Sequence, residues 1–199
     1  MYRLILVLFT CFSSVISYGQ ATFGWDMFDN FSLFTEGKER FQISYSNEKG
    51  NYEIFFTHIT YENGYDSSWI ISDLGGFKQD LKELQSKYIS WIEIANNNDV
   101  KTVEKEIPCS ISFRTGSCSN IAYPMSIEVK PYFVVESGKP RCEVRVWQYW
   151  QYEDRSERNY HCWRLLPNDI PFILSAIDQS FKEYLERKQK KQQTEDLFH

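Results

Sequence analysis

The sequence has few histidines and no closely spaced pair of cysteines. His58, His161 and His199 are the only histidines, and His199 is the terminal residue. A serine or cysteine nucleophile needs a neighbouring base, and structural zinc sites favour cysteine pairs such as C-x2-C. The G-x-S-x-G, H-E-x-x-H, EF-hand and glycine-rich phosphate-loop motifs are also missing. The sequence therefore predicts no catalytic residues, no metal site and no cofactor.

The chain also has no excess of basic residues. Its 27 acidic residues outnumber its 22 basic ones, which gives a formal net charge of −5. Proteins that bind nucleic acid need a basic surface. The one basic cluster, at residues 187–191, lies at the end of a predicted helix, where cations complement the helix dipole. We therefore predict that nucleic acid is not a partner.

The only long apolar run is at the N-terminus. Arg3 is followed by the apolar residues 4–9, and small residues stand two apart at Ser17 and Gly19. This arrangement is typical of a secretory signal. A membrane anchor would need roughly 20 consecutive apolar residues, whereas serines and a threonine interrupt this run. We predict cleavage after Gly19, with cleavage after Ala21 as second choice, and no transmembrane segment in the mature chain.

The export signal predicts a periplasmic or extracellular protein. Residues 8–11 faintly resemble a bacterial lipoprotein box, which makes a lipid anchor at Cys11 a minor alternative. The resemblance is incomplete because Thr10 stands where the box has Gly, Ala or Ser. The mature chain of about 180 residues is long enough for one domain and short for two. We predict that residues 20–191 form that domain and that residues 192–199 form a flexible tail.

Four cysteines follow the predicted signal, namely Cys109, Cys118, Cys142 and Cys162. An even number of cysteines in an exported chain suggests disulfides. Four cysteines allow three pairings, and the sequence does not choose among them. Cys109 with Cys118 is the most local option.

Hydrophobic periodicity predicts two groups of strands, each followed by a helix. Strands are expected where apolar and polar residues alternate, over residues 41–45, 52–61, 69–71, 109–113, 125–135, 141–152 and 160–166. Helices are expected over residues 77–95 and from Asn168, where apolar residues recur every three or four positions. We predict an α+β fold in which one antiparallel sheet carries both amphipathic helices on one face.

The predicted strand over residues 141–152 carries an unusual face. Its alternate residues include Arg145, Trp147 and Tyr149, which mix charge with large aromatic rings, so we expect this face to be exposed. Tryptophan and tyrosine offer a large contact area with a polar tip and are frequent in binding sites. The alternative, and the commoner role of such residues, is that they cover the sheet as cross-strand aromatic pairs.

These observations lead to one preferred function and two alternatives. We predict an exported, non-enzymatic module that binds a protein or a glycan through Arg145, Trp147 and Tyr149. The first alternative is a small secreted hydrolase with paired carboxylates near Glu143 and Glu153. With 27 acidic residues, such proximity is expected by chance. The second alternative, a structural component of the cell envelope, has no positive sign in the sequence.

Overall fold

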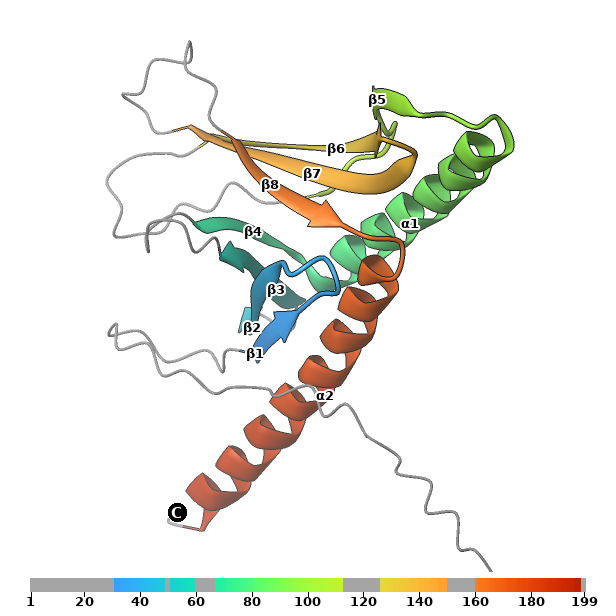
Figure 1. The fold of residues 1–199 in the computed structure, drawn as a ribbon. Coiled ribbons are helices and arrows are strands. Elements are labelled where there is room, and N and C mark those ends of the chain that lie inside the picture. Colours follow the sequence, from blue (N-terminus) through green and yellow to red (C-terminus); the bar gives the residue numbers. More distant parts are fainter. Residues whose placement is uncertain (1–30, 49–50, 60–66, 113–125, 150–159, 198–199) are drawn as a thin grey trace, which may run out of the picture.

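A computed structural model of the protein describes residues 31–48, 51–59, 67–112, 126–149 and 160–197. Over these residues, four strands, a helix, four strands and a second helix follow one another (Figure 1). The strands are β1 (Phe31–Phe34), β2 (Arg40–Glu48), β3 (Asn51–Ile59), β4 (Ser67–Asp73), β5 (Thr102–Glu106), β6 (Ser126–Glu136), β7 (Lys139–Tyr149) and β8 (Tyr160–Leu165). The helices are α1 (Leu74–Asn97) and α2 (Asp169–Asp196).

The strands form two antiparallel sheets, ordered β1-β2-β3-β4 and β5-β6-β7-β8. Both helices lie on the same side of these sheets (Figure 1). The α+β class and the order of strands and helices are therefore confirmed, but the strands divide into two sheets where we expected one. The division has a simple origin. Helix α1 carries the chain away from β4 before β5 begins, and β5 pairs with β6 instead.

One hydrophobic core joins both sheets and both helices. Trp163 of β8 lies against the inner face of the first sheet, with its ring centroid 5.5 Å from that of Phe41 and 5.4 Å from that of Phe56. Helix α1 contributes the apolar stripe predicted from its 3–4 spacing, and the stripe is buried at Phe77, Leu81, Leu84, Tyr88 and Ala95. The second sheet is therefore fixed to the first through side chains rather than through backbone pairing.

The strand predicted over residues 109–113 is not formed at residues 109–112, and residue 113 lies outside the described ranges. Residues 107–112 lie against α1 instead, where the Ser112 N–H donates to the Asp80 carboxylate at 2.6 Å. The strand formed in this region is β5. Its sequence ends in three consecutive charged residues, so the apolar alternation that predicts a strand is missing. Apolar alternation alone predicted a strand here, and no strand among the described residues pairs with this segment.

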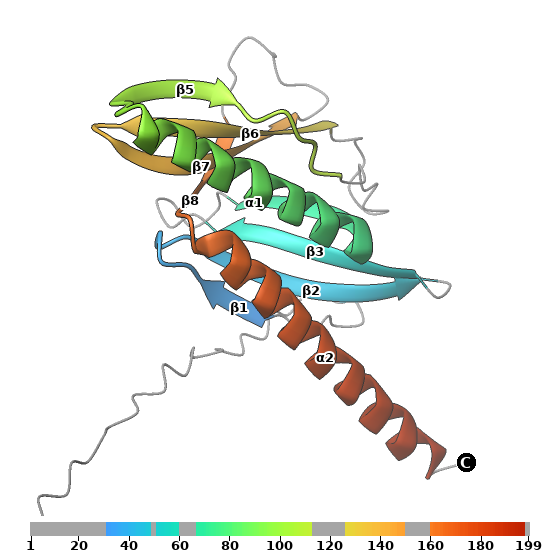
Figure 2. The ribbon, with the colours of Figure 1, turned by 90° about the vertical axis from the view of Figure 1, so that its right-hand side faces the viewer.

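The ends of α2 also differ from expectation. We expected the helix to begin at Asn168, whereas it begins at Asp169, and the Asn168 side chain makes no capping hydrogen bond. The Asp169 carboxylate accepts from the Leu166 N–H at 2.7 Å instead. The helix continues through residues 192–196, which we expected to belong to a flexible tail, and this end extends beyond the sheets (Figure 2).

No helix within the described ranges is long and apolar enough to cross a membrane. The predicted signal, with Cys11, lies outside the described residues, as do Cys118 and Glu153.

Candidate ligand-binding face on the second sheet

Strand β7 has one buried apolar face and one polar face, as its sequence predicted. Cys142, Val144 and Val146 are fully buried in the core. Between them, Glu143 and Arg145 belong to the opposite face, which we call the outer face of the second sheet. This face consists of alternate residues of the four strands: Glu104, Glu106, Glu128, Lys130, Tyr132, Val134, Glu136, Arg141, Glu143, Arg145, Trp147, Tyr160, Cys162 and Arg164.

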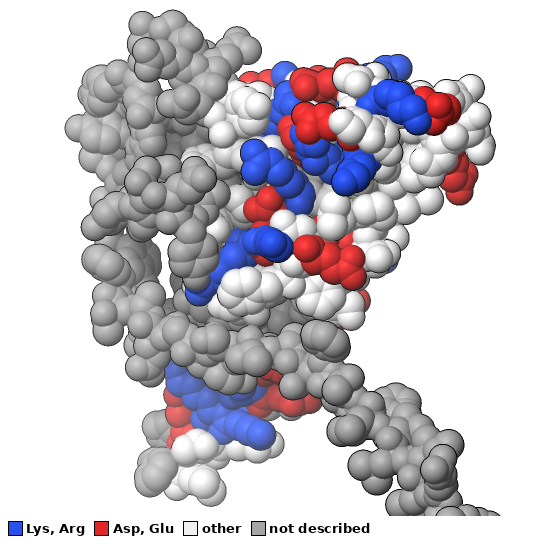
Figure 3. Space-filling view, in the orientation of Figure 1, with Lys and Arg blue, Asp and Glu red and all other residues white. Residues whose placement is uncertain are grey.

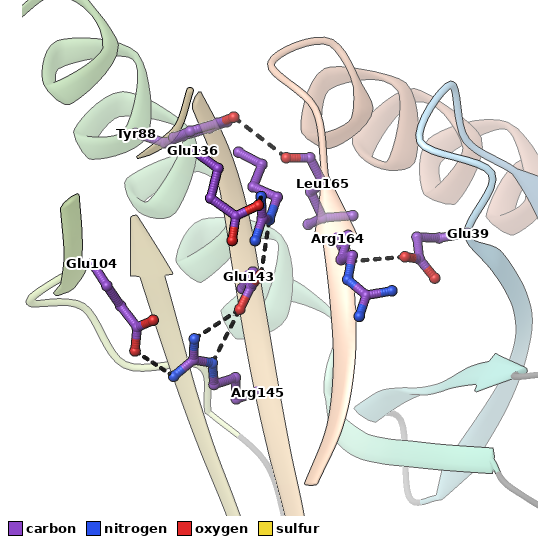
Figure 4. A network of polar contacts seen from close by, with 9 residues as sticks. Glu39, Tyr88, Glu104, Glu136, Glu143, Arg145, Arg164 and Leu165 are labelled. Atoms are coloured by element: carbon purple, nitrogen blue, oxygen red, sulfur yellow. Dashed lines mark hydrogen bonds and ion pairs between the residues drawn. The ribbon is translucent and has the colours of Figure 1, made fainter. Parts of the chain in front are cut away.

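Charges of both signs are mixed over the part of the molecule formed by β5 to β8 (Figure 3). Arg145 lies at the centre of this pattern. Its guanidinium donates to the Glu104 carboxylate at 2.8 Å and to the Glu143 carboxylate at 2.8 and 3.2 Å (Figure 4). The same guanidinium stacks on two rings, 4.2 Å from the centroid of Tyr132 and 5.2 Å from that of Tyr160. Arg145 is therefore held on several sides by β5, β6, β7 and β8.

Glu143 lies between two arginines. Arg141 Nε donates to one of its oxygens at 2.8 Å, and Arg145 donates to the other. Burial of Glu143 opposes ionisation, but the hydrogen bonds and charges of Arg145 and Arg141 outweigh it and hold the pKa of the carboxyl below its usual range. This carboxylate is ionised at neutral pH and fully engaged by its partners.

Trp147 is buried, with 9% of its surface exposed, although we expected an exposed side chain. The antiparallel register places Tyr160 directly opposite it, and the ring centroids are 5.2 Å apart. The Lys130 ammonium lies 5.9 Å from the Trp147 centroid on the other side. Trp147 thus forms a cross-strand aromatic pair of the ordinary kind. For Tyr149 the structure gives only the position in the strand, opposite Ser126.

Among the aromatic side chains of this face that the structure describes, Tyr160 is the most exposed, at 43%. The sequence alone did not mark Tyr160 as a site residue, because Tyr160 stands at the start of β8 and its neighbours depend on the β7–β8 register. Only that register brings Tyr160 beside Trp147 and Arg145. The relevant signal in the sequence was the concentration of aromatic residues in these two strands.

No family model, curated protein or solved structure matches this chain. A fold of this class hosts many unrelated functions. Its function must therefore be argued from the chemistry of its own side chains.

The expected disulfides are not formed among the described cysteines, since Cys109, Cys142 and Cys162 are free thiols. Cys142 points into the core and Cys162 lies opposite Arg145 on the outer face, so the sheet separates these two. Burial is the main cause that raises the pKa of the Cys162 thiol to about 12. Cys162 is therefore protonated and a poor nucleophile at neutral pH.

Within the described ranges, no group of three or more His, Cys, Asp or Glu side chains is placed to hold a metal ion.

A second polar cluster, which the sequence did not predict, links the two sheets. His58 of β3 is 1% exposed, and its Nε2 lies 2.6 Å from Glu39 Oε2. The other Glu39 oxygen accepts from the Arg164 N–H of β8 at 3.0 Å (Figure 4). The imidazole packs against the rings of Phe41 and Trp163. Because this ring is enclosed in the core, the cluster is a structural link rather than a reaction site.

Proposed function

We propose that this protein is an exported, non-enzymatic binding module. Its contact surface is the outer face of the second sheet around Tyr160 and Arg145. The observation that carries this proposal is the solvent-exposed Tyr160 ring, which lies beside the Arg145 guanidinium (5.2 Å) and the Trp147 ring (5.2 Å) of β7. Tyrosine and arginine, presented together on a rigid sheet, are the side chains that most often dominate binding energy.

The rigidity of this face supports a binding role. Arg145 is fixed by ion pairs to Glu104 and Glu143, and the β7–β8 register fixes Tyr160 beside it. Side chains that are already ordered lose little conformational entropy when a ligand binds. A contact made by Tyr160 therefore retains most of its interaction free energy.

The charges of the face favour an uncharged, hydroxyl-rich ligand. Arg141 and Arg145 are both paired with carboxylates, so the guanidinium charges are largely neutralised. The exposed carboxylate of Glu104 (56%), which lies beside Arg145, offers acceptor oxygens for hydroxyl groups. Tyr160 offers an aromatic surface against which a sugar ring can pack. A glycan is therefore the first ligand class to test, and a protein partner is the second.

The hydrolase alternative is less well supported. A glycosidase of the common type needs one carboxylic acid that can give up a proton and a second carboxylate facing it. Glu143 is ionised and engaged by two arginines, which does not suit it as the acid. The geometry of the outer face therefore favours binding over hydrolysis.

The proposal is tested by replacing Tyr160 with alanine in the mature protein. The wild-type protein is first titrated with a glycan panel and then with envelope proteins, while tryptophan fluorescence is recorded. For the ligand so found, Tyr160→Ala is expected to weaken binding about tenfold, the loss typical of a central aromatic contact.

The matched control is Phe34→Ala, which removes an aromatic ring of similar exposure (53%) from β1 of the first sheet. This control should bind as the wild type does. Unchanged affinity for Tyr160→Ala, or an equal loss in both variants, would contradict the proposed site.

A further inference from the structure

Cys142 lies in the layer between the second sheet and α1. Its partners in the register are Phe133 of β6 and Leu165 of β8. Both of them contact Tyr88 of α1. The ring centroids of Tyr88 and Phe133 are 6.0 Å apart, and the Tyr88 hydroxyl donates to the Leu165 carbonyl at 3.3 Å. The Cys142 thiol is therefore fully buried on the side of the sheet that Tyr88 covers.

Cys109 reaches the same layer from the segment that follows β5. The Lys87 ammonium of α1 donates to the carbonyl of Pro108, next to Cys109. The Ile107 N–H donates at 2.8 Å to the carbonyl of Pro131 in β6, the strand that pairs with β7. Cys109 itself is half-buried and packs against the same hydrophobic core. Two contacts, one to α1 and one to β6, thus place Cys109 near the layer that holds Cys142.

The electrostatics of the two thiols agree with this placement. Burial raises the pKa of the Cys142 thiol most strongly, and the charge of an ionised Cys109 is the next largest cause. Cys162, whose effect is smaller, lies on the outer face of the sheet.

We infer that Cys109 and Cys142 form an oxidisable pair, and that a disulfide oxidant joins them into a disulfide that fastens the segment after β5 to strand β7. This pairing differs from Cys109–Cys118, which is the most local of the three pairings that the sequence left open. The structure as described is the reduced form of the pair.

The reaction is a thiol–disulfide exchange in two steps. Cys109 is the half-buried member, so its thiolate attacks the oxidant disulfide, forms a mixed disulfide and releases one thiolate of the oxidant. The Cys142 thiolate then attacks the Cys109 sulfur and releases the second thiolate. The two protein thiols lose two protons and two electrons, and the oxidant disulfide is reduced to two thiols.

The rate of this exchange should depend steeply on pH. Burial raises the pKa of Cys109 to about 11, so little thiolate is present at pH 7. Below that pKa the thiolate fraction rises about tenfold for each pH unit. Oxidation of the folded protein should therefore be slow at neutral pH and should accelerate by about this factor per unit between pH 7 and 10.

The experiment uses the reduced, folded mature protein with excess oxidised glutathione. Samples are quenched by alkylation, digested without reduction and analysed by mass spectrometry. We expect a peptide that joins Cys109 to Cys142 as the main intramolecular cross-link, and a higher melting temperature for the oxidised protein. A main cross-link between Cys109 and Cys118, or glutathione adducts without any intramolecular bond, would overturn the inference.

Two cysteine variants test the Cys109–Cys142 pair without relying on the mass-spectrometric cross-link. Cys118→Ser should keep the cross-link and the gain in melting temperature. Cys109→Ser removes a half-buried thiol, so it should fold and lose both effects. A gain that survives in Cys109→Ser, or that disappears in Cys118→Ser, would refute the pair.

Discussion

At the scale of single residues, the paired charges of the outer face determine how stability depends on pH. The pKa of Glu143 is lowered in the folded protein because Arg145 and Arg141 favour its ionised form. Stability from such a group is fully present above the pKa of the unfolded chain, about 4.3, and is lost as pH falls through the folded value. Acidification below pH 4.5 should therefore weaken the protein through Glu143.

The variant Glu143→Gln tests this directly. It should be about 2 kcal/mol less stable than the wild type at pH 7, between the values typical of exposed and of buried ion pairs. The difference should shrink below about pH 4, where the unfolded wild-type chain takes up a proton at this carboxyl and so loses less on unfolding. Urea unfolding of both proteins at several pH values measures this difference in the free energy of unfolding. A difference that stays constant from pH 7 to pH 3 would show that the charge of Glu143 is not responsible.

The residue scale also shows what the sequence could predict of the candidate site. Period-2 alternation correctly assigned Arg145 to the outer face and Cys142 to the core. It did not predict that Trp147 is covered or that Tyr160 is the exposed ring. Alternation tells which side of a strand a residue is on, whereas exposure depends on the cross-strand neighbour and therefore on register.

At the scale of elements, local periodicity predicted both helices and the strands β2 and β3. The features that periodicity did not predict concern how strands pair with one another. Residues 109–113 alternate like a strand, but residues 107–112 lie against α1. Proline cannot donate a ladder hydrogen bond and is usual at an edge or a bulge, yet Pro131 stands in β6, which lies between β5 and β7. It is tolerated there because the pairing with β5 ends at Tyr132, so an N–H at Pro131 is not needed on that side.

The junction between the β1–β2 turn and α2 is an element contact that no local pattern indicated. Asp169 is fully buried, and its carboxylate accepts from the backbone N–H groups of Glu36 (2.8 Å), Gly37 (3.3 Å) and Leu166 (2.7 Å). Gly37 is required at this approach, because a Cβ there would lie 2.7 Å from the Arg164 carbonyl oxygen. One side chain thus fixes the start of α2 to the first sheet and to the end of β8.

We expect Asp169→Ala to destabilise the protein by about 3 kcal/mol, because it leaves three part-buried N–H groups without their acceptor. Urea unfolding at neutral pH measures the change. The control is Asp178→Ala on the same helix, which removes an exposed carboxylate paired with Lys78 and should cost less than about 0.5 kcal/mol. Similar losses in the two variants would contradict the role given to the Asp169 junction.

At the scale of the whole molecule, two sheets without a shared backbone ladder must be held together by side chains. Trp163 makes the central contact, since it is fully buried and its ring packs on Phe41 and Phe56 of the first sheet. The Glu39 bridge between His58 and the Arg164 N–H lies beside it. With one core common to both sheets, unfolding should be a single transition in which neither half persists alone.

Trp163→Ala should therefore cost about 4 kcal/mol, as for other large core residues, and should lower amide-exchange protection in both sheets together. Trp91→Ala is the matched control. Trp91 is only partly buried and packs on Phe133 of the second sheet, so the loss of stability in Trp91→Ala should be smaller and local to β5 and β6.

If Trp163→Ala left protection of the first sheet unchanged, or if fluorescence and circular dichroism gave separate transitions, the sheets would be independent units. A surface on the second sheet could then be altered without regard to the first. A single transition means instead that the outer face around Tyr160 owes its rigidity to the whole core.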